Sequence, residues 1–188
     1  MTWTIPNILT LLRIILIPVL VLVFYSPLPW SYQISAAIFG LAAVTDWLDG
    51  YLARRLQQHS VFGAFLDPVA DKLMVTVALV LLVQDNPSPL FAVPAAIIVG
   101  REIAISALRE WMSEIGERTK VAVSIIGKIK TTIQMAAILL LLYKLPLGAF
   151  PSHDAGVMLL YIAAILTLWS MLVYLRAAWP ILAGDADA

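Results

Sequence analysis

Four aspartates in one short segment are the side chains of this sequence most able to do chemistry. Asp46, Asp49, Asp67 and Asp71 belong to a chain that is 62% hydrophobic and 13% charged. A carboxylate near the middle of a bilayer costs roughly 2.5–3.5 kcal/mol, and neighbouring carboxylates repel one another. Protonation or a bound cation would relieve this cost. Clustered carboxylates without nearby His or Cys favour a hard ion, so we predict Mg²⁺ or Mn²⁺, with two ions able to clamp a diphosphate.

The two pairs of acids can face one cleft if the chain folds back between them. Apolar stretches at about 34–57 and 63–83 flank a polar turn near residue 58. As antiparallel helices that rise about 1.5 Å per residue, they bring all four carboxylates to a similar depth. Helical periodicity gives each helix one acidic face that also carries a small residue, and the first face adds a cation. The faces are Asp46, Asp49, Gly50, Ala53 and Arg54 on the first helix, and Gly63, Asp67 and Asp71 on the second. The small residues would let a bulky group approach, and the arginine could bind phosphate.

Each part of this pattern also has a simpler explanation. Asp46 and Asp49 could be helix-end acids or a proton-relay pair in a transporter. Asp67 lies before a proline and could cap a helix that begins there. Gly50 and Gly63 could be ordinary helix-packing residues. The combined spacing of these residues favours a catalytic site.

The elements that position the acids are predicted to be membrane-spanning helices. A mean hydropathy of +0.93 is too high for a soluble chain of 188 residues. Because backbone groups must be paired in lipid, and the apolar stretches are too long for barrel strands, we predict an all-α polytopic membrane protein. Residues 1–188 are expected to form one membrane-embedded domain. The six predicted transmembrane helices are 7–25, 34–57, 63–83, 90–113, 124–145 and 156–178.

The basic residues predict the orientation. Six helices put both termini on one side, and every Lys and Arg except Lys144 falls on that side or in helix ends near it. The positive-inside rule makes this side, with the acids, cytoplasmic. No basic region precedes the first apolar stretch, so we expect no cleavable signal peptide. The lack of Cys excludes disulfides and thiolate metal sites. Membrane lipids are expected partners, and nucleic acid is not.

The acidic hairpin carries the signature of a known family. The pattern Asp46-x2-Asp49-Gly50-x2-Ala53-Arg54-x8-Gly63-x3-Asp67-x3-Asp71 resembles that of the CDP-alcohol phosphatidyltransferases at all eight fixed positions. The resemblance covers nearly the whole chain, is least distinctive from about residue 146 onward, and is closest to the branch of the family that uses glycerol 3-phosphate. It rests on the segments IPNILTLLRIILIP, VTDWLDGYLARR, FGAFLDPVADK, REIAISALREWM and GKIKTT.

This resemblance implies an enzyme of the bacterial inner membrane that transfers the phosphatidyl group of CDP-diacylglycerol to sn-glycerol 3-phosphate and releases CMP at the cytoplasmic face. It further implies a homodimer. By the same resemblance, Asp46, Asp49 and Asp67 would bind one or two divalent ions. Asp71 would share in metal binding or act as the general base. Gly50 and Arg54 would contact the cytidine diphosphate portion of CDP-diacylglycerol, and Gly63 would leave room beside it.

One side of the first helix could complete the head-group cavity. Asn7, Thr10 and Arg13 are spaced three residues apart and lie on that side. They could equally cap the helix and supply an interfacial cation.

A group of basic residues could bind the second substrate. Arg101 lies inside an apolar stretch, so it needs a neighbouring acid such as Glu102 or a ligand phosphate. The family resemblance implies that Arg101, Arg109, Lys128 and Lys130 bind the phosphate of glycerol 3-phosphate. A dianionic phosphate requires several cations, which favours a phosphorylated acceptor. Each cation could instead follow the inside-positive bias and contact anionic lipids.

Three other functions would also use membrane-embedded acids. A relative within the family could take inositol phosphate or phosphatidylglycerol as its acceptor. An aromatic prenyltransferase would be expected to carry its two acidic motifs far apart in sequence, not on one hairpin. An ion-coupled transporter with Asp46 and Asp71 as coupling sites would explain the acids but not the clustered cations.

Overall fold

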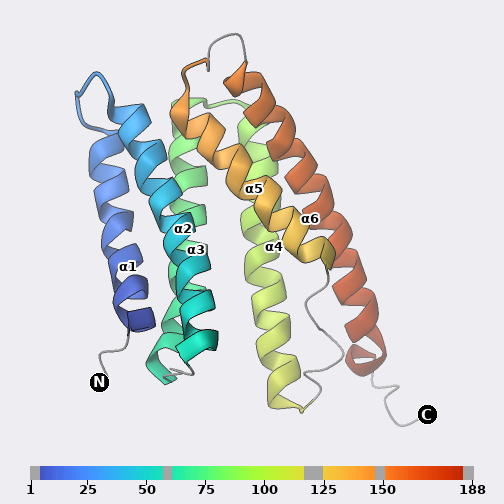
Figure 1. Ribbon diagram of the computed structural model, residues 1–188. Coiled ribbons are helices and arrows are strands. Elements are labelled where there is room, and N and C mark those ends of the chain that lie inside the picture. The colour runs from blue at the N-terminus through green and yellow to red at the C-terminus, as the bar shows by residue number, and fades with distance from the viewer. Residues whose placement is uncertain (1–4, 57–60, 117–124, 147–150, 184–188) are drawn as a thin grey trace.

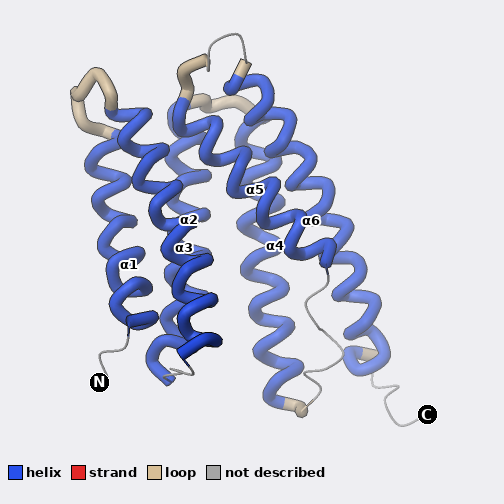
Figure 2. Tube along the Cα trace, in the orientation of Figure 1, coloured by secondary structure: helices blue, strands red, loops and turns tan. Residues whose placement is uncertain are grey.

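The computed structural model describes residues 5–56, 61–116, 125–146 and 151–183, and these residues form helices joined by short connections. Figure 2 shows that no strand occurs among them, which confirms the all-α prediction. Each helix covers one of the six predicted segments, and its ends differ from the predicted ones by only a few residues. The helices are α1 (Ile5–Phe24), α2 (Ser31–Leu56), α3 (Val61–Asp85), α4 (Pro89–Glu114), α5 (Ile125–Tyr143) and α6 (Ser152–Leu182).

The six helices run alternately up and down (Figure 1). The start of α1, the end of α2, the start of α3 and the ends of α4 and α6 lie at the lower end of the bundle. The most extensive packing is between α5 and α6 and between α1 and α2, and α4 packs mainly against α6. The acidic segments of α2 and α3 are therefore held in the lower half of the bundle.

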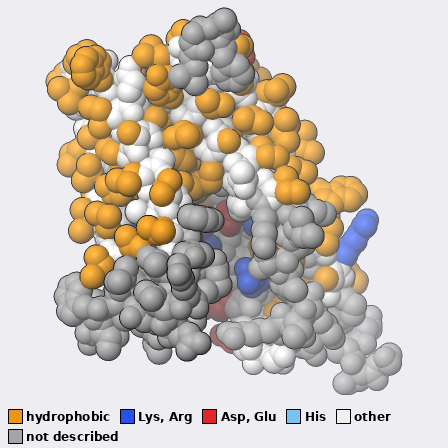
Figure 3. Space-filling view, in the orientation of Figure 1, with side chains coloured by type: hydrophobic (Ala, Val, Ile, Leu, Met, Phe, Trp, Pro, Cys, Tyr) orange, Lys and Arg blue, Asp and Glu red, His pale blue; other side chains and the backbone are white. Residues whose placement is uncertain are grey.

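Much of the outer surface is apolar. In the described part of the chain, three helical segments are long and apolar enough to cross a membrane: Asn7–Phe24, Pro89–Glu114 and Ser152–Trp179. A shorter apolar segment covers Ile129–Tyr143. Figure 3 shows hydrophobic side chains over most of the upper part of one face. Such a surface is typical of contact with lipid. Six membrane spans, with both termini on one side, stay a prediction.

The hydrophobic core is built by α1 to α6 around fully buried side chains. The packing is closest between α5 and α6, where a Cβ added to Gly156 would lie 2.8 Å from Leu141 Cγ. A small residue at that point lets the two helices approach each other. The largest fully buried apolar side chains are Leu20, Phe39, Met74, Leu79, Leu82, Ile98, Met112, Ile138, Leu141 and Leu142.

The start of α3 decides how Asp67 is oriented. The helix begins at Val61, so Asp67 and Pro68 lie inside it. The alternative in which Asp67 caps a helix beginning at the proline is therefore wrong. Because Asp67 and Asp71 are one helical turn apart, they lie on the same face of α3.

Candidate active site

A cavity of about 630 Å³ lies among α1 to α5. This volume is in the range typical of small-molecule sites. Figure 3 shows charged side chains gathered in a hollow in the lower half of the molecule. Hydrophobic side chains, hydroxyl side chains and the amide of Gln134 supply the rest of the wall. The charged residues that line the cavity are Arg13, Asp46, Asp67, Asp71, Lys72 and Glu102.

The acidic side of the cavity combines two helices. Asp46 comes from α2, and Asp67 and Asp71 come from α3. Three of the four predicted acids therefore line one cavity. Asp49 lies one turn after Asp46 in α2, but its side chain is outside the part of the chain that the structure describes.

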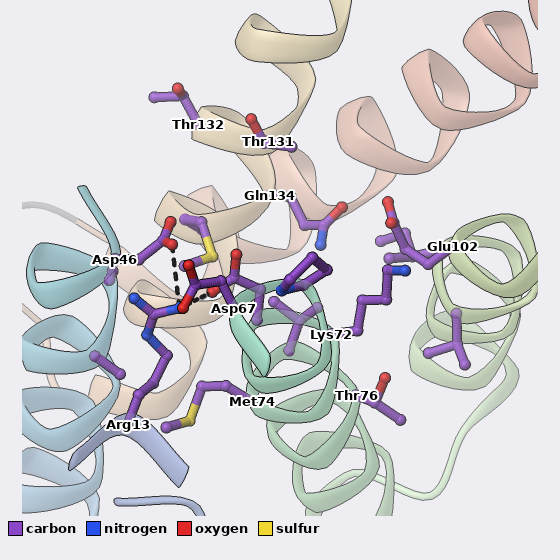
Figure 4. Close-up of a pocket in the computed structure, with 18 residues that line it drawn as sticks. Arg13, Asp46, Asp67, Lys72, Met74, Thr76, Glu102, Thr131, Thr132 and Gln134 are labelled. Atoms are coloured by element: carbon purple, nitrogen blue, oxygen red, sulfur yellow. Dashed lines mark hydrogen bonds and ion pairs between the residues drawn. The ribbon is translucent and has the colours of Figure 1, made fainter. Parts of the chain in front are cut away.

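Helix α1 supplies a cation and a hydroxyl to these acids. Arg13, only 1% exposed, has its Nη1 atom 3.1 Å from Asp46 Oδ1 and donates a hydrogen bond to Asp71. The Thr10 hydroxyl donates a hydrogen bond to Asp67. Figure 4 shows Arg13 and two of the acids on one side of the cavity. The guanidinium offsets the mutual repulsion of two partly buried carboxylates.

The carboxylates suit a divalent ion in chemistry but do not yet form a closed ligand set. Among the described residues, no three acidic or His side chains form a group that could hold a metal ion. Arg13 lies between Asp46 and Asp71, in the place where a cation is needed. The hard oxygen donors of these carboxylates are of the type that Mg²⁺ prefers.

The basic side of the site is organised by one acid. Glu102 Oε1 accepts hydrogen bonds from Arg101 Nη1 at 2.9 Å and from Lys130 Nζ at 2.8 Å. The guanidinium carbon of Arg101 also lies 5.5 Å from the ring centroid of Tyr174 in α6, a cation–π contact. Lys130 is 1% exposed. Arg101 therefore has the partner that its position in an apolar helix requires.

The other predicted site residues are not among the described residues that line the cavity. Asn7 is buried in α1, and Gly63 is buried in α3. Arg109 is exposed on α4 and is not among the described residues that line the cavity. Gly50, Arg54 and Lys128 lie in helices, but their side-chain environments are outside the described part of the structure.

Three polar residues of α5 line the cavity without having been singled out from the sequence. They are Thr131, Thr132 and Gln134. Gln134 is 4% exposed, and its Oε1 atom is buried with no hydrogen-bond partner among the described residues. Gln134 follows Lys130 by one helical turn, and this spacing is the signal in the sequence that would have placed both on one face.

A separate ion pair lies at the opposite end of the bundle. Lys144 Nζ is 2.6 Å from Asp85 Oδ2 and 3.9 Å from the ring centroid of Tyr32. Burial lowers the pKa of Lys144, but hydrogen bonds to Asp85 and Tyr32 outweigh it, so the pKa is raised above its usual value. None of these three residues is among the described residues that line the cavity.

Comparison with known proteins gives one consistent result. The family model for CDP-alcohol phosphatidyltransferase matches residues 3–169. The chain is 55% identical over 178 residues to the CDP-diacylglycerol–glycerol-3-phosphate 3-phosphatidyltransferase of Salmonella choleraesuis, covering 95% of this chain and 96% of the relative. Relatives of the same name from Escherichia coli K12 and Pseudomonas fluorescens are both 56% identical, over 95% and 96% of this chain and 96% and 93% of their own. The chain therefore belongs to the CDP-alcohol phosphatidyltransferase family.

Proposed function

We propose that this chain transfers the phosphatidyl group of CDP-diacylglycerol to sn-glycerol 3-phosphate, giving phosphatidylglycerophosphate and CMP. The observation that carries the proposal is the likeness to relatives named for this reaction, at 55–56% identity over 95–96% of the chain. The cavity also supports the proposal. It has carboxylates on one side, and on the other side Glu102 with its two paired cations, Arg101 and Lys130.

The reaction is a substitution at phosphorus. A hydroxyl oxygen of glycerol 3-phosphate forms a bond to the phosphorus of the phosphatidyl group, and the bond to the CMP oxygen breaks. Asp71 receives the hydroxyl proton as general base, or shares in metal binding. Asp46, Asp49 and Asp67 would hold one or two Mg²⁺ or Mn²⁺ ions. When bound, these ions would polarise the phosphorus and neutralise the charge that develops on the departing CMP.

The side chains from α1 set up this arrangement. Thr10 orients Asp67 through its hydroxyl hydrogen bond, and Arg13 holds Asp71 before substrate arrives. CDP-diacylglycerol is bound by Gly50, Arg54 and Gly63, with Asn7 and Thr10 beside the head group. Arg101, Arg109, Lys128 and Lys130 bind the acceptor's phosphate.

We infer that all six helices span the bacterial inner membrane, with the cavity open to the cytoplasm, and that the protein acts as a homodimer. The alternating direction of the helices and their apolar outer surface support the six spans (Figure 1). The uneven distribution of Lys and Arg supports the orientation.

The test is CMP release by purified protein supplied with CDP-diacylglycerol, Mg²⁺ and one acceptor at a time. Glycerol 3-phosphate should support turnover, whereas inositol phosphate and phosphatidylglycerol should not. Activity with inositol phosphate but not with glycerol 3-phosphate would overturn the assignment of the acceptor. An absence of CMP release with every acceptor would overturn the enzyme assignment itself.

A further inference from the structure

The carboxylate of Glu102 stands between the cavity and two buried cations. Among the described residues, Glu102 lines the cavity, whereas Arg101 and Lys130 do not. A single oxygen of Glu102 accepts hydrogen bonds from both cations. Figure 4 shows Glu102 across the cavity from Arg13 and Asp46. An anion that approaches the two cations from the cavity therefore meets a carboxylate first.

The charges of this group are not balanced. Arg101 and Lys130 contribute two positive charges against one negative charge from Glu102, so the group carries one excess positive charge. If a phosphate dianion joined the group, three negative charges would face two positive ones. If the dianion replaced Glu102 at the cations, two negative charges would face two positive charges. At Arg101 and Lys130, the two cations that contact Glu102, electrostatics at such short range favours replacement over addition.

We propose that Glu102 is an internal anion that occupies the acceptor's phosphate subsite until the phosphate group displaces it. This inference rests on the proposed function and adds a positioning role for Glu102. In the empty site, the carboxylate keeps two buried cations paired and close together. It also sets a threshold for ligands, because a phosphate monoester carries enough charge to displace it and a neutral alcohol does not.

The experiment measures thermal unfolding of detergent-purified protein during titration with inorganic phosphate and with glycerol 3-phosphate. Neither CDP-diacylglycerol nor Mg²⁺ is added. Without phosphate, Glu102→Gln should unfold at a lower temperature than the unmodified chain, because two buried cations lose their anion. Phosphate should then raise its unfolding temperature, with a half-maximal effect at about a tenfold lower concentration than in the unmodified chain.

Asp85→Asn is the matched control, because it also removes a carboxylate from a cation but does so outside the described lining of the cavity. Its response to phosphate should equal that of the unmodified chain. Sodium chloride at equal ionic strength and glycerol should have no comparable effect on Glu102→Gln. A titration with CMP tests the other phosphate-bearing molecule in the reaction. If Glu102→Gln strengthened the effect of CMP on the unfolding temperature as much as that of glycerol 3-phosphate, the assignment of the subsite to the acceptor would be overturned.

An equal or higher half-maximal phosphate concentration in Glu102→Gln would overturn the proposal, because Glu102 would then assist binding. If this variant does not fold, Glu102→Asp decides, since it keeps the charge but reaches less far towards the cations. It too should respond at a lower concentration than the unmodified chain, and an unchanged or higher value would overturn the proposal. The assay needs no turnover. Tighter phosphate binding by the variant, without CMP release by the unmodified chain, would overturn the proposed function and leave the subsite standing.

Discussion

The two sides of the cavity use opposite charges in the same way. On the acidic side, the cation Arg13 joins the carboxylates of Asp46 and Asp71. On the basic side, the anion Glu102 joins the cations Arg101 and Lys130. In each case two like charges are held together by one side chain of opposite charge.

A membrane enzyme can in this way keep charged sites stable before its ligands arrive. An isolated charge in an apolar surrounding is costly, and two like charges are worse. One internal counter-charge reduces that cost without neutralising the pair. A ligand with more charge can then displace it, a divalent cation on one side and a phosphate dianion on the other.

Loss of a carboxylate from the acidic side of the cavity should remove most of the catalysis. Metal binding contributes several kcal/mol of transition-state stabilisation. Asp46→Asn should therefore reduce CMP release by about 10³-fold or more. Asp85→Asn makes the same change outside the cavity and should keep nearly full activity. If Asp46→Asn and Asp85→Asn lost activity to the same degree, a catalytic role for Asp46 would be excluded.

Removal of a cation from the basic side should affect one substrate only. Lys130→Met removes a charged hydrogen bond of about 1.5–3 kcal/mol, so the KM for glycerol 3-phosphate should rise about 10- to 100-fold. The KM for CDP-diacylglycerol should change little. Lys144→Met is the control, because it removes a lysine from the opposite end of the bundle. Equal rises in both KM values for Lys130→Met would exclude Lys130 from the acceptor subsite.

Arg13 should compete with the metal for the carboxylates of the acidic side, just as Glu102 should compete with phosphate for the cations of the basic side. Arg13→Met should unfold at a lower temperature without metal, because Asp46 and Asp71 lose their counter-charge. Mg²⁺ should then raise its unfolding temperature more than that of the unmodified chain. A difference of about 1 kcal/mol corresponds to roughly 2–4 °C in a chain of this size. Thermal unfolding with Mg²⁺ or with chelator measures this effect.

Arg13→Met and Glu102→Gln should differ in which ligand stabilises them. Arg13→Met should respond more strongly to Mg²⁺ but not to phosphate, and Glu102→Gln should do the reverse. A Mg²⁺ response in Arg13→Met no larger than in the unmodified chain would show that Arg13 does not hold the metal's place. Arg13→Lys keeps the charge, so its Mg²⁺ response should lie between those of the unmodified chain and Arg13→Met. It decides the question if Arg13→Met does not fold.

The sequence predicted the helices and the acidic face well, because both depend on local periodicity. Apolar stretches located all six helices, and a spacing of one helical turn put Asp67 and Asp71 on the same face. The cap interpretation of Asp67 failed because the helical pattern begins before it, at Val61. The metal and substrate roles of these residues stay predictions.

The counter-charges could be predicted only in part, since they depend on contacts between distant segments. Arg13 was expected beside the head group, but its partners lie in α2 and α3, and only tertiary packing brings them together. Glu102 was foreseen as a possible partner for Arg101. Its second contact, with Lys130, depends on how α5 crosses α4 and has no signal in the local sequence.

The ion pair of Lys144 and Asp85 lies outside the described lining of the cavity and should respond to neither phosphate nor Mg²⁺. Hydrogen bonds to Asp85 and Tyr32 raise the pKa of Lys144 in the folded chain above its ordinary value of 10.5. Protonated Lys144 therefore stabilises the fold fully below about pH 10.5, and this contribution is lost as the pH rises through the higher folded value. Lys144→Met should accordingly unfold at a slightly lower temperature than the unmodified chain at pH 8, and the gap should narrow at strongly alkaline pH. Thermal unfolding at both pH values, with and without phosphate and Mg²⁺, measures this. A gap that closed when either ligand was added would mean that the ion pair communicates with the cavity, and the contrast between ligand-displaced and purely structural pairs would fail.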